Sequence, residues 1–238
     1  MNLGRSISKR LNKVANKFGF DLKPQNFEYH LHEYASYEDY RSTQIATNEQ
    51  KLQHVWADEQ TLDLVVERAK KEFATADPIF ALCHGTRNGF EQNYIASRIE
   101  GEILGTDISP TATQFPRSVV WDFHDTNEEW RGKCHFIYSN SIDQSWKPKL
   151  ALSTWIDQLR PGGLLFLEHS KDQSAETARK ADPFGVSPKY LPYVLCDWFG
   201  HDVSIEIIHA HKGESTTWKK NVGMDFRHKE KPVTAYVA

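Results

Sequence analysis

The chain has 238 residues and a net charge of −3; 39% of its residues are hydrophobic and 26% are charged. This size and balance are typical of one folded α/β domain with a few added elements, and they argue against disorder along the whole chain. The longest apolar run is far shorter than the ~18 residues that span a bilayer, so no transmembrane helix is expected.

The N-terminal segment differs from the rest in charge. Residues 1–17 contain five basic residues and no acidic residue, which leaves the remainder of the chain acidic. Apolar residues in this segment recur at helical spacing: Leu3, Ile7, Leu11, Val14 and Phe18. A helix docked on the body and peripheral contact of residues 1–17 with an anionic membrane both fit this pattern. An acidic body disfavours nucleic acid as a partner, because such binding depends on neutralising phosphates.

Two further helices are expected before residue 78. A polar helix is predicted over residues 37–55, and the next helix begins after Asp58, a typical N-cap residue. The apolar stripe of that second helix consists of Leu62, Val65, Val66, Ala69 and Phe73. We therefore divide the chain into an N-terminal helical extension, residues 1–57, and a main domain, residues 58–238.

From residue 78 onward, short apolar runs alternate with helical patterns. The expected strands cover residues 79–83, 102–107, 118–123, 134–139 and 164–168. Helices are expected over residues 90–99 and 152–159, and a Pro161-Gly162-Gly163 turn closes the second of them. This alternation predicts an α/β fold with a Rossmann-like, doubly wound and mostly parallel sheet.

The pattern changes after the fifth expected strand. Residues 171–188 are polar and contain two prolines and a glycine, which indicates a long loop and a candidate lid or acceptor-recognition element. A helix is expected over residues 190–199. The segments 203–209 and 216–226 suit the two strands of a hairpin.

Three polar features follow successive expected strands in order. Gly85 and Gly89 lie in the turn after the first strand, where glycine permits positive φ and close approach of a ligand. Asp107 ends the second strand, at the position where a carboxylate can accept hydrogen bonds from ribose hydroxyls. Asp122 ends the third strand beside Phe123, so a carboxylate and an aromatic ring could meet an adenine there. Ligands of open α/β sheets bind at this edge.

At these residues the chain resembles the class I S-adenosylmethionine-dependent methyltransferases, over roughly residues 78–170. The resemblance implies S-adenosylmethionine as cofactor and a sheet of about seven strands whose last strand runs antiparallel. It implies that the glycine turn holds the methionine part, that Asp107 binds the ribose and that Asp122 reads the adenine. The cofactor contacts that it implies are His84, Gly85, Thr86, Gly89, Asp107, Ile108, Asp122, Phe123 and Ser139.

The glycine turn departs from the family pattern in two respects. Cys83-His84 stands where the family often has an acid, and Arg87 is inserted between only two glycines. Arg87 could grip the methionine carboxylate or face solvent.

The residues that would act on the acceptor are expected after the fourth and fifth strands. A hydroxyl acceptor must lose a proton, which requires a base whose pKa is near neutral. His169 is the first candidate because it directly follows the fifth expected strand, at the carboxyl edge of the sheet, and because histidine has a suitable pKa. Asp143 is the second candidate. The sequence therefore predicts methyl transfer to a small molecule or a saccharide, at a hydroxyl oxygen.

Cysteine usage bears on location and on metals. Cys83, Cys134 and Cys196 form no CxxC pair, and the N-terminus lacks the apolar core of a secretory signal, so a reducing cytoplasm is expected. Histidines, cysteines and acids do not occur at metal-site spacing, so no metal is expected.

Three other functions stay open at this point. A dinucleotide-dependent oxidoreductase would use a similar glycine turn and ribose-binding acid, but it has no need of Asp122 and normally shows GxGxxG. An aminopropyl transferase would use a related cofactor. A non-catalytic methyltransferase-like scaffold would act through its basic N-terminal helix. The sequence does not assign an oligomeric state.

Overall fold

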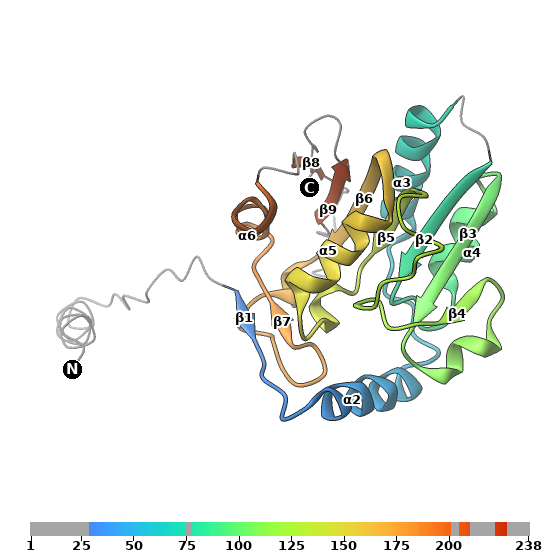
Figure 1. Ribbon diagram of the computed structural model, residues 1–238. Coiled ribbons are helices and arrows are strands. Elements are labelled where there is room, and N and C mark those ends of the chain that lie inside the picture. The colour runs from blue at the N-terminus through green and yellow to red at the C-terminus, as the bar shows by residue number, and fades with distance from the viewer. Residues whose placement is uncertain (1–28, 75–77, 201–204, 210–221, 228–238) are drawn as a thin grey trace.

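The computed structural model describes residues 29–74, 78–200, 205–209 and 222–227 (Figure 1). The helix predicted in residues 1–17, and with it the membrane contact, lies outside these residues and stays a prediction. Across the described ranges, no helix combines the length and the apolarity that a membrane crossing requires.

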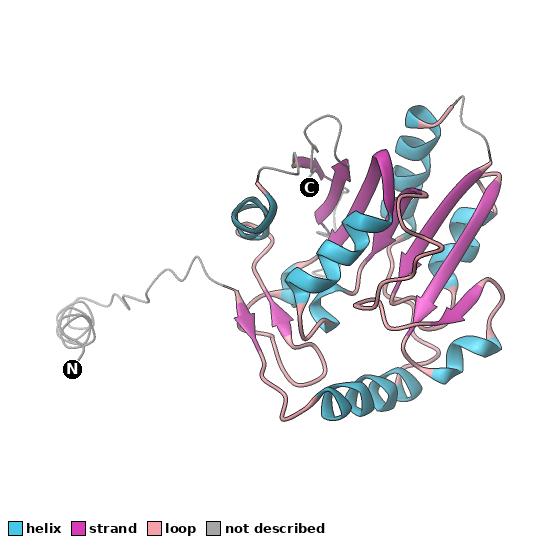
Figure 2. Cartoon of the chain, viewed as in Figure 1, coloured by secondary structure: helices cyan, strands magenta, loops and turns pink. Residues whose placement is uncertain are grey.

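A seven-stranded sheet in the order β4-β3-β2-β5-β6-β9-β8 forms the centre of the described structure (Figures 1 and 2). Its strands are β2 (Ile79–His84), β3 (Gly101–Asp107), β4 (Ser118–Val120), β5 (Cys134–Ser139), β6 (Leu159–His169), β8 (Glu206–His209) and β9 (Val222–Arg227). The pairings from β4 to β6 are all parallel, whereas β9 is antiparallel to both β6 and β8. The predicted Rossmann-like sheet with an antiparallel last strand is confirmed.

Helices cover both faces of this sheet, where β2, β3, β5 and β6 place apolar side chains on either side. The helices are α2 (Tyr37–Gln50), α3 (Glu59–Glu72), α4 (Phe90–Ala96), α5 (Pro148–Gln158) and α6 (Leu191–Phe199). The predicted N-cap is confirmed, since the Asp58 carboxylate accepts a hydrogen bond from the Thr61 N–H at 3.2 Å. Short 3-10 turns cover η1 (Pro110–Gln114), η2 (Ile142–Gln144) and η3 (Lys171–Gln173).

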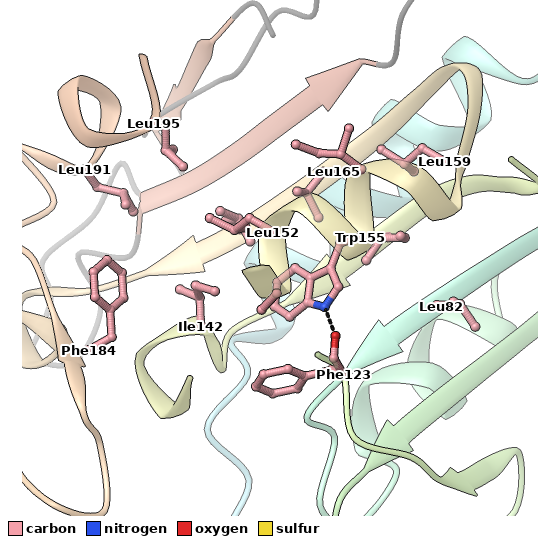
Figure 3. Close-up of a cluster of buried hydrophobic side chains, with 14 of the residues drawn as sticks. Leu82, Phe123, Ile142, Leu152, Trp155, Leu159, Leu165, Phe184, Leu191 and Leu195 are labelled. Atoms are coloured by element: carbon pink, nitrogen blue, oxygen red, sulfur yellow. Dashed lines mark hydrogen bonds between the residues drawn. The ribbon is translucent and has the colours of Figure 1, made fainter. Parts of the chain in front are cut away.

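Two hydrophobic cores lie on opposite faces of the sheet. The stripe of α3 packs with α4 and with Ile79, Ile103 and Phe166 of the strands in one core. The other core includes leucines of β2, β6 and α6 together with the fully buried Trp155 of α5, whose indole N–H donates to the Phe123 carbonyl at 2.9 Å (Figure 3). Cys83 and Cys134 are both fully buried, and neither forms a disulfide.

The Pro161-Gly162-Gly163 prediction is wrong in one respect. These residues do not form a turn before the strand, because β6 already begins at Leu159, which pairs with Cys134. Pairing resumes at Leu164 with Phe136, and the residues between bulge out of the ladder. A bulge tolerates the missing proline N–H, and Gly162 adopts a φ of 76° there.

The chain also crosses the carboxyl edge of the sheet. The predicted loop over residues 171–188 contains a strand, β7 (Phe184–Gly185), which pairs antiparallel with β1 (His30–Leu31) in a separate two-stranded sheet. From β1 the chain continues into α2, which runs below the strand ends in Figure 1. The predicted division at residue 57 stays a prediction; α2, on its N-terminal side, contacts the edge where the candidate site lies.

Candidate functional site

The turn after β2 brings its backbone close to the neighbouring loop. Gly85 and Gly89 both have a φ of 77°, a conformation that favours glycine. A Cβ atom on Gly85 would lie 2.5 Å from the Cβ of Ser141, so no larger residue fits there without a shift. Gly89 precedes α4 as its N-cap residue. The glycines are therefore required by the turn itself.

Asp107 lies at the end of β3 with both carboxylate oxygens occupied. Oδ1 accepts from the Ser109 N–H at 2.8 Å and from Asn48 Nδ2 of α2 at 2.9 Å. Oδ2 accepts from the Arg87 N–H of the glycine turn at 2.9 Å. Asp107 is 7% exposed, and its burial raises the pKa of the carboxyl above the ordinary aspartate value.

Asp122 follows β4 and is held in the same manner. Its Oδ1 is 2.6 Å from His124 Nδ1, and its Oδ2 accepts from the Tyr37 hydroxyl of α2 at 2.8 Å. Burial opposes ionisation, but the hydrogen bonds and charge of His124 outweigh it and lower the pKa of Asp122. His124 Nε2 is in turn 2.6 Å from Ser145 Oγ. Ser145 is fully buried and lines neither of the two cavities described below, so this Asp-His-Ser chain fixes Asp122 in place.

The region between the two carboxylates is nearly filled. Ile108 and Phe123, both expected to contact the cofactor, line a hollow of only about 20 Å³ together with Asp107 and Asp122. Residues of α2 line the opposite side: Tyr40, Gln44, Thr47 and Asn48. This volume has room for about one water molecule.

A larger cavity of about 260 Å³ opens beside the glycine turn. Gly85, Thr86 and Arg87 form one side of it, and Asp143, on the 3-10 turn η2 after β5, lies on another. The remaining walls come from Glu91 of α4, Glu168 of β6 and the segment that contains Arg179 and Asp182. Strand ends and loops therefore build a polar cavity at the edge where open α/β sheets bind ligands.

Three carboxyl groups in this cavity have raised pKa values. Burial raises the pKa of Asp143 to about 7, and the nearby charge of Asp182 adds to the shift. Burial likewise raises the pKa of Glu91 to about 7 and that of Glu168 to about 8. Glu168 Oε2 accepts from the Tyr138 hydroxyl at 2.6 Å, whereas Asp143 Oδ1 and Glu91 Oε2 have no hydrogen-bond partner within the described part of the chain. Such groups in a cavity are candidates for binding or proton transfer.

Arg87 borders both the cavity and the narrow hollow. Arg87 adopts a φ of 44°, in the left-handed region, and its Nε has no hydrogen-bond partner among the described residues. Its NH1 is 3.4 Å from the His54 carbonyl. The sequence left open whether Arg87 grips the methionine carboxylate or faces solvent. The structure shows that Arg87 lines the site.

The structure does not bring His169 to the cavity. Side chains alternate along β6, so Glu168 faces the cavity and His169 faces the other side of the sheet. His169 is fully buried, and its Nε2 donates to the Val186 carbonyl at 2.7 Å. Burial lowers the pKa of His169 to about 4, so the ring is neutral at pH 7. The geometry gives a substrate-contacting base at His169 no support.

Two other expected cofactor contacts also turn away from the cavity. The His84 ring lies between Thr106 Oγ1 at 2.8 Å and Gln158 Oε1 at 2.9 Å and stacks on Trp155. Ser139 Oγ donates to the His84 carbonyl and is fully buried. Both side chains stabilise the strand ends, and neither is placed to touch a ligand.

Sequence reasoning missed Glu91, Glu168 and the contributions of α2. Glu91 had a usable signal, because it is an acid in the first turn of the helix after the glycine turn. The sequence pattern places Glu168 at the end of the fifth expected strand but indicates no functional role for it. Within the described ranges, no cluster of three or more histidine, cysteine or acidic residues is arranged to hold a metal ion.

Comparisons with known proteins find similar folds among solved structures. Neither a protein-family model nor a curated protein sequence matches the chain. The 1,6-didemethyltoxoflavin-N1-methyltransferase of Burkholderia thailandensis, with bound S-adenosylhomocysteine, superposes with a TM-score of 0.61 at 13% identity, covering 83% of this chain and 92% of that one. Magnesium protoporphyrin IX methyltransferase from Synechocystis, with bound S-adenosylmethionine, gives a TM-score of 0.56 at 13% identity, covering 83% and 100%.

The N-methyltransferase NodS of Bradyrhizobium japonicum, in complex with S-adenosylhomocysteine, gives a TM-score of 0.55 at 12% identity, covering 79% and 100%. This chain has the fold of the class I S-adenosylmethionine-dependent methyltransferases. The methyltransferase fold brings the glycine turn, Asp107 and Asp122 to one sheet edge, in the order that the sequence predicted.

Proposed function

We propose that the chain is an S-adenosylmethionine-dependent methyltransferase that acts on a small molecule. The observation that carries this proposal is the shared edge of the methyltransferase-fold sheet. A glycine turn and two strand-end carboxylates, Asp107 and Asp122, meet there beside a polar cavity. The second carboxylate favours this reading over a dinucleotide-dependent oxidoreductase, which needs only the first.

The types of residue at this sheet edge suit the nucleoside part of the cofactor. In this assignment the Asp107 carboxylate accepts from the ribose hydroxyls, and the Asp122 carboxylate accepts from the exocyclic amine of adenine. Phe123 and Ile108 supply the apolar surface beside the ring, since both line the hollow between the carboxylates. In this fit the two donors that α2 now places on the carboxylates must give way to the nucleoside.

Arg87 and Glu91 suit the amino-acid end of the cofactor. A half-buried cation and a buried acid, each with an atom that lacks a hydrogen-bond partner within the described residues, line one cavity beside Gly85. We assign the Arg87 guanidinium to the carboxylate of the cofactor and the Glu91 carboxylate to its ammonium group. This pair takes over from the family's usual acid, whose place is held by the buried Cys83.

Asp143 is the candidate general base for a hydroxyl acceptor. When bound, S-adenosylmethionine supplies an electrophilic methyl group, and the chain's task is to align the acceptor, exclude water and hold the released proton. Asp143 lines the cavity, its Oδ1 has no protein partner within the described residues, and its pKa of about 7 suits proton transfer at neutral pH. Amides and charged groups around the cavity support a small hydroxylated acceptor, such as a saccharide.

Isothermal titration calorimetry with three ligands tests this function. S-adenosylhomocysteine is expected to bind, and NAD is expected not to bind. 5′-Methylthioadenosine, which lacks the amino-acid end, is expected to bind about tenfold more weakly or worse, because charge-assisted hydrogen bonds at Arg87 and Glu91 are lost.

The variant Arg87→Met is expected to reduce the difference in affinity between S-adenosylhomocysteine and 5′-methylthioadenosine. The control Arg131→Met, at an exposed position, is expected to leave this difference unchanged. Binding of NAD in place of S-adenosylhomocysteine would favour the oxidoreductase. If neither S-adenosylhomocysteine nor NAD binds, the result would favour the non-catalytic scaffold.

A further inference from the structure

Helix α2 satisfies both of the carboxylates assigned to the nucleoside. Asn48 Nδ2 donates to Asp107 Oδ1 at 2.9 Å, and the Tyr37 hydroxyl donates to Asp122 Oδ2 at 2.8 Å. The other bonds to these carboxylates come from the loops that directly follow their strands and from the glycine turn. The helix thus supplies one N–H donor and one O–H donor where a nucleoside would supply its hydroxyl and amine donors.

The amide of Asn48 is oriented for this contact. Its Oδ1 accepts from the Thr111 hydroxyl at 2.8 Å, which turns Nδ2 toward Asp107. Asn48 is 6% exposed, so the contact forms in a dry environment. In addition, Tyr40 of α2 is 2% exposed and stacks on Trp146 with ring centroids 5.5 Å apart. The hollow of about 20 Å³ that remains beneath α2 cannot admit a nucleoside.

The attachment of α2 combines polar contacts with the aromatic contacts of Tyr37 and Tyr40. Its buried residues, Tyr40, Gln44 and Asn48, lie four residues apart on one helix face. Among the residues that the structure describes, neither hydrophobic core includes any part of α2. A helix held by hydrogen bonds and by the ring contacts of Tyr37 and Tyr40 can leave the sheet edge without exposing either of the two hydrophobic cores.

We propose that α2 is a lid that closes the nucleoside subsite of the free protein, with Asn48 and Tyr37 occupying the carboxylates that the cofactor must take over. This inference rests on the proposed function. The bound state keeps the carboxylates satisfied, because nucleoside donors replace those of α2. Binding of the nucleoside therefore includes displacement of α2 from the sheet edge.

The lid is also connected to the larger cavity. Gln44 Nε2 donates to the Ala181 carbonyl at 3.0 Å, and Lys180 Nζ lies 2.6 Å from Asp39 Oδ1. The neighbouring residues Arg179 and Asp182 line the cavity assigned to the acceptor. Displacement of α2 therefore loosens one wall of the acceptor cavity as the cofactor binds.

Hydrogen–deuterium exchange of the full chain tests the lid directly. In the wild-type protein, saturating S-adenosylhomocysteine is expected to speed exchange in residues 37–50 while it slows exchange in the glycine turn. Slower exchange in residues 37–50 on binding would overturn the proposal, since α2 would then close over the ligand.

Calorimetry of lid variants gives a second readout. Tyr37→Phe combined with Asn48→Ala is expected to bind S-adenosylhomocysteine about tenfold more tightly, because the binding-competent state is then more populated. The control Glu49→Ala, at an exposed position of the same helix, is expected to match the wild type. Unchanged or weaker binding by the double variant, with its melting temperature intact, would also overturn the lid.

The two proposals fail differently. If the wild type binds the ligand and the lid variants bind no more tightly, only the lid fails. If neither the wild type nor the double variant binds, the proposed function fails, and the lid with it.

Discussion

Replacing Asp107 by alanine is expected to weaken S-adenosylhomocysteine binding by about 100-fold or more. Two ribose hydroxyls would each lose a hydrogen bond to a charged acceptor, and such bonds contribute about 1.5–3 kcal/mol each. The loss is large because Asp107 is buried at the sheet edge, where water cannot substitute for it. Calorimetry or equilibrium dialysis measures the change.

Two further variants test whether weaker binding reflects a lost contact or a misfolded protein. Asp107→Asn keeps the shape of the side chain and can still accept from the Ser109 N–H, so it is expected to fold like the wild type and still to bind poorly. Asp157→Ala removes an exposed carboxylate of α5 and is expected to leave binding unchanged. Near wild-type affinity in a folded Asp107→Asn protein would remove Asp107 from the cofactor site.

Replacing Asp143 by asparagine is expected to lower kcat by about 10²–10⁴-fold, the usual contribution of a general base. The wild-type rate is expected to rise with pH up to about 7, because burial raises the pKa of Asp143 to that value and only its ionised form accepts a proton. Asp143→Asn lacks this group, so its residual rate is expected to lose this rise when S-adenosylmethionine is saturating and ionisation of Glu91 no longer limits cofactor binding.

Initial rates between pH 5 and 9 would test this, with radiolabelled S-adenosylmethionine and a hydroxylated acceptor found by screening. Asp172→Asn, an exposed acid of the same cavity, is expected to keep both the rate and the pH dependence of the wild type. A rising limb that persists in Asp143→Asn would assign the base to another group.

The sequence predicted the sheet, and the position of Asp107 and Asp122 at one edge of it, for a physical reason. Apolar strands that alternate with helical stripes define parallel sheet order, and parallel strands bring their carboxyl ends to one edge. The sequence pattern alone therefore places Asp107 and Asp122 at the same edge. Gly85 was equally accessible, because its positive φ is a local property of the turn.

The prediction failed where side-chain direction decides the outcome. The pattern placed His169 at the correct strand end, but the strand continues one residue past Glu168, and one residue of register moves a side chain to the opposite face. The base assignment therefore shifts to Asp143, which lies on a turn whose path the sequence pattern does not specify.

The position of α2 could not be predicted for a different reason. Its buried face of Tyr40, Gln44 and Asn48 has no apolar stripe, so nothing in its pattern indicates which surface it covers. The contacts of Asn48 and Tyr37 join residues 59 and 85 positions apart. Such pairings depend on the assembled sheet edge and appear only in three dimensions.

A crystal structure of the full chain with S-adenosylhomocysteine tests the central claim most directly. The account predicts ribose hydroxyls on Asp107, adenine between Asp122 and Phe123, and the thioether sulfur facing the cavity that Asp143 lines. It also predicts that Asn48 and Tyr37 have left the two carboxylates. Ligand bound away from the sheet edge, or a crystal soaked to saturation with Asp107 still bonded to Asn48 and no ligand at the edge, would contradict the account.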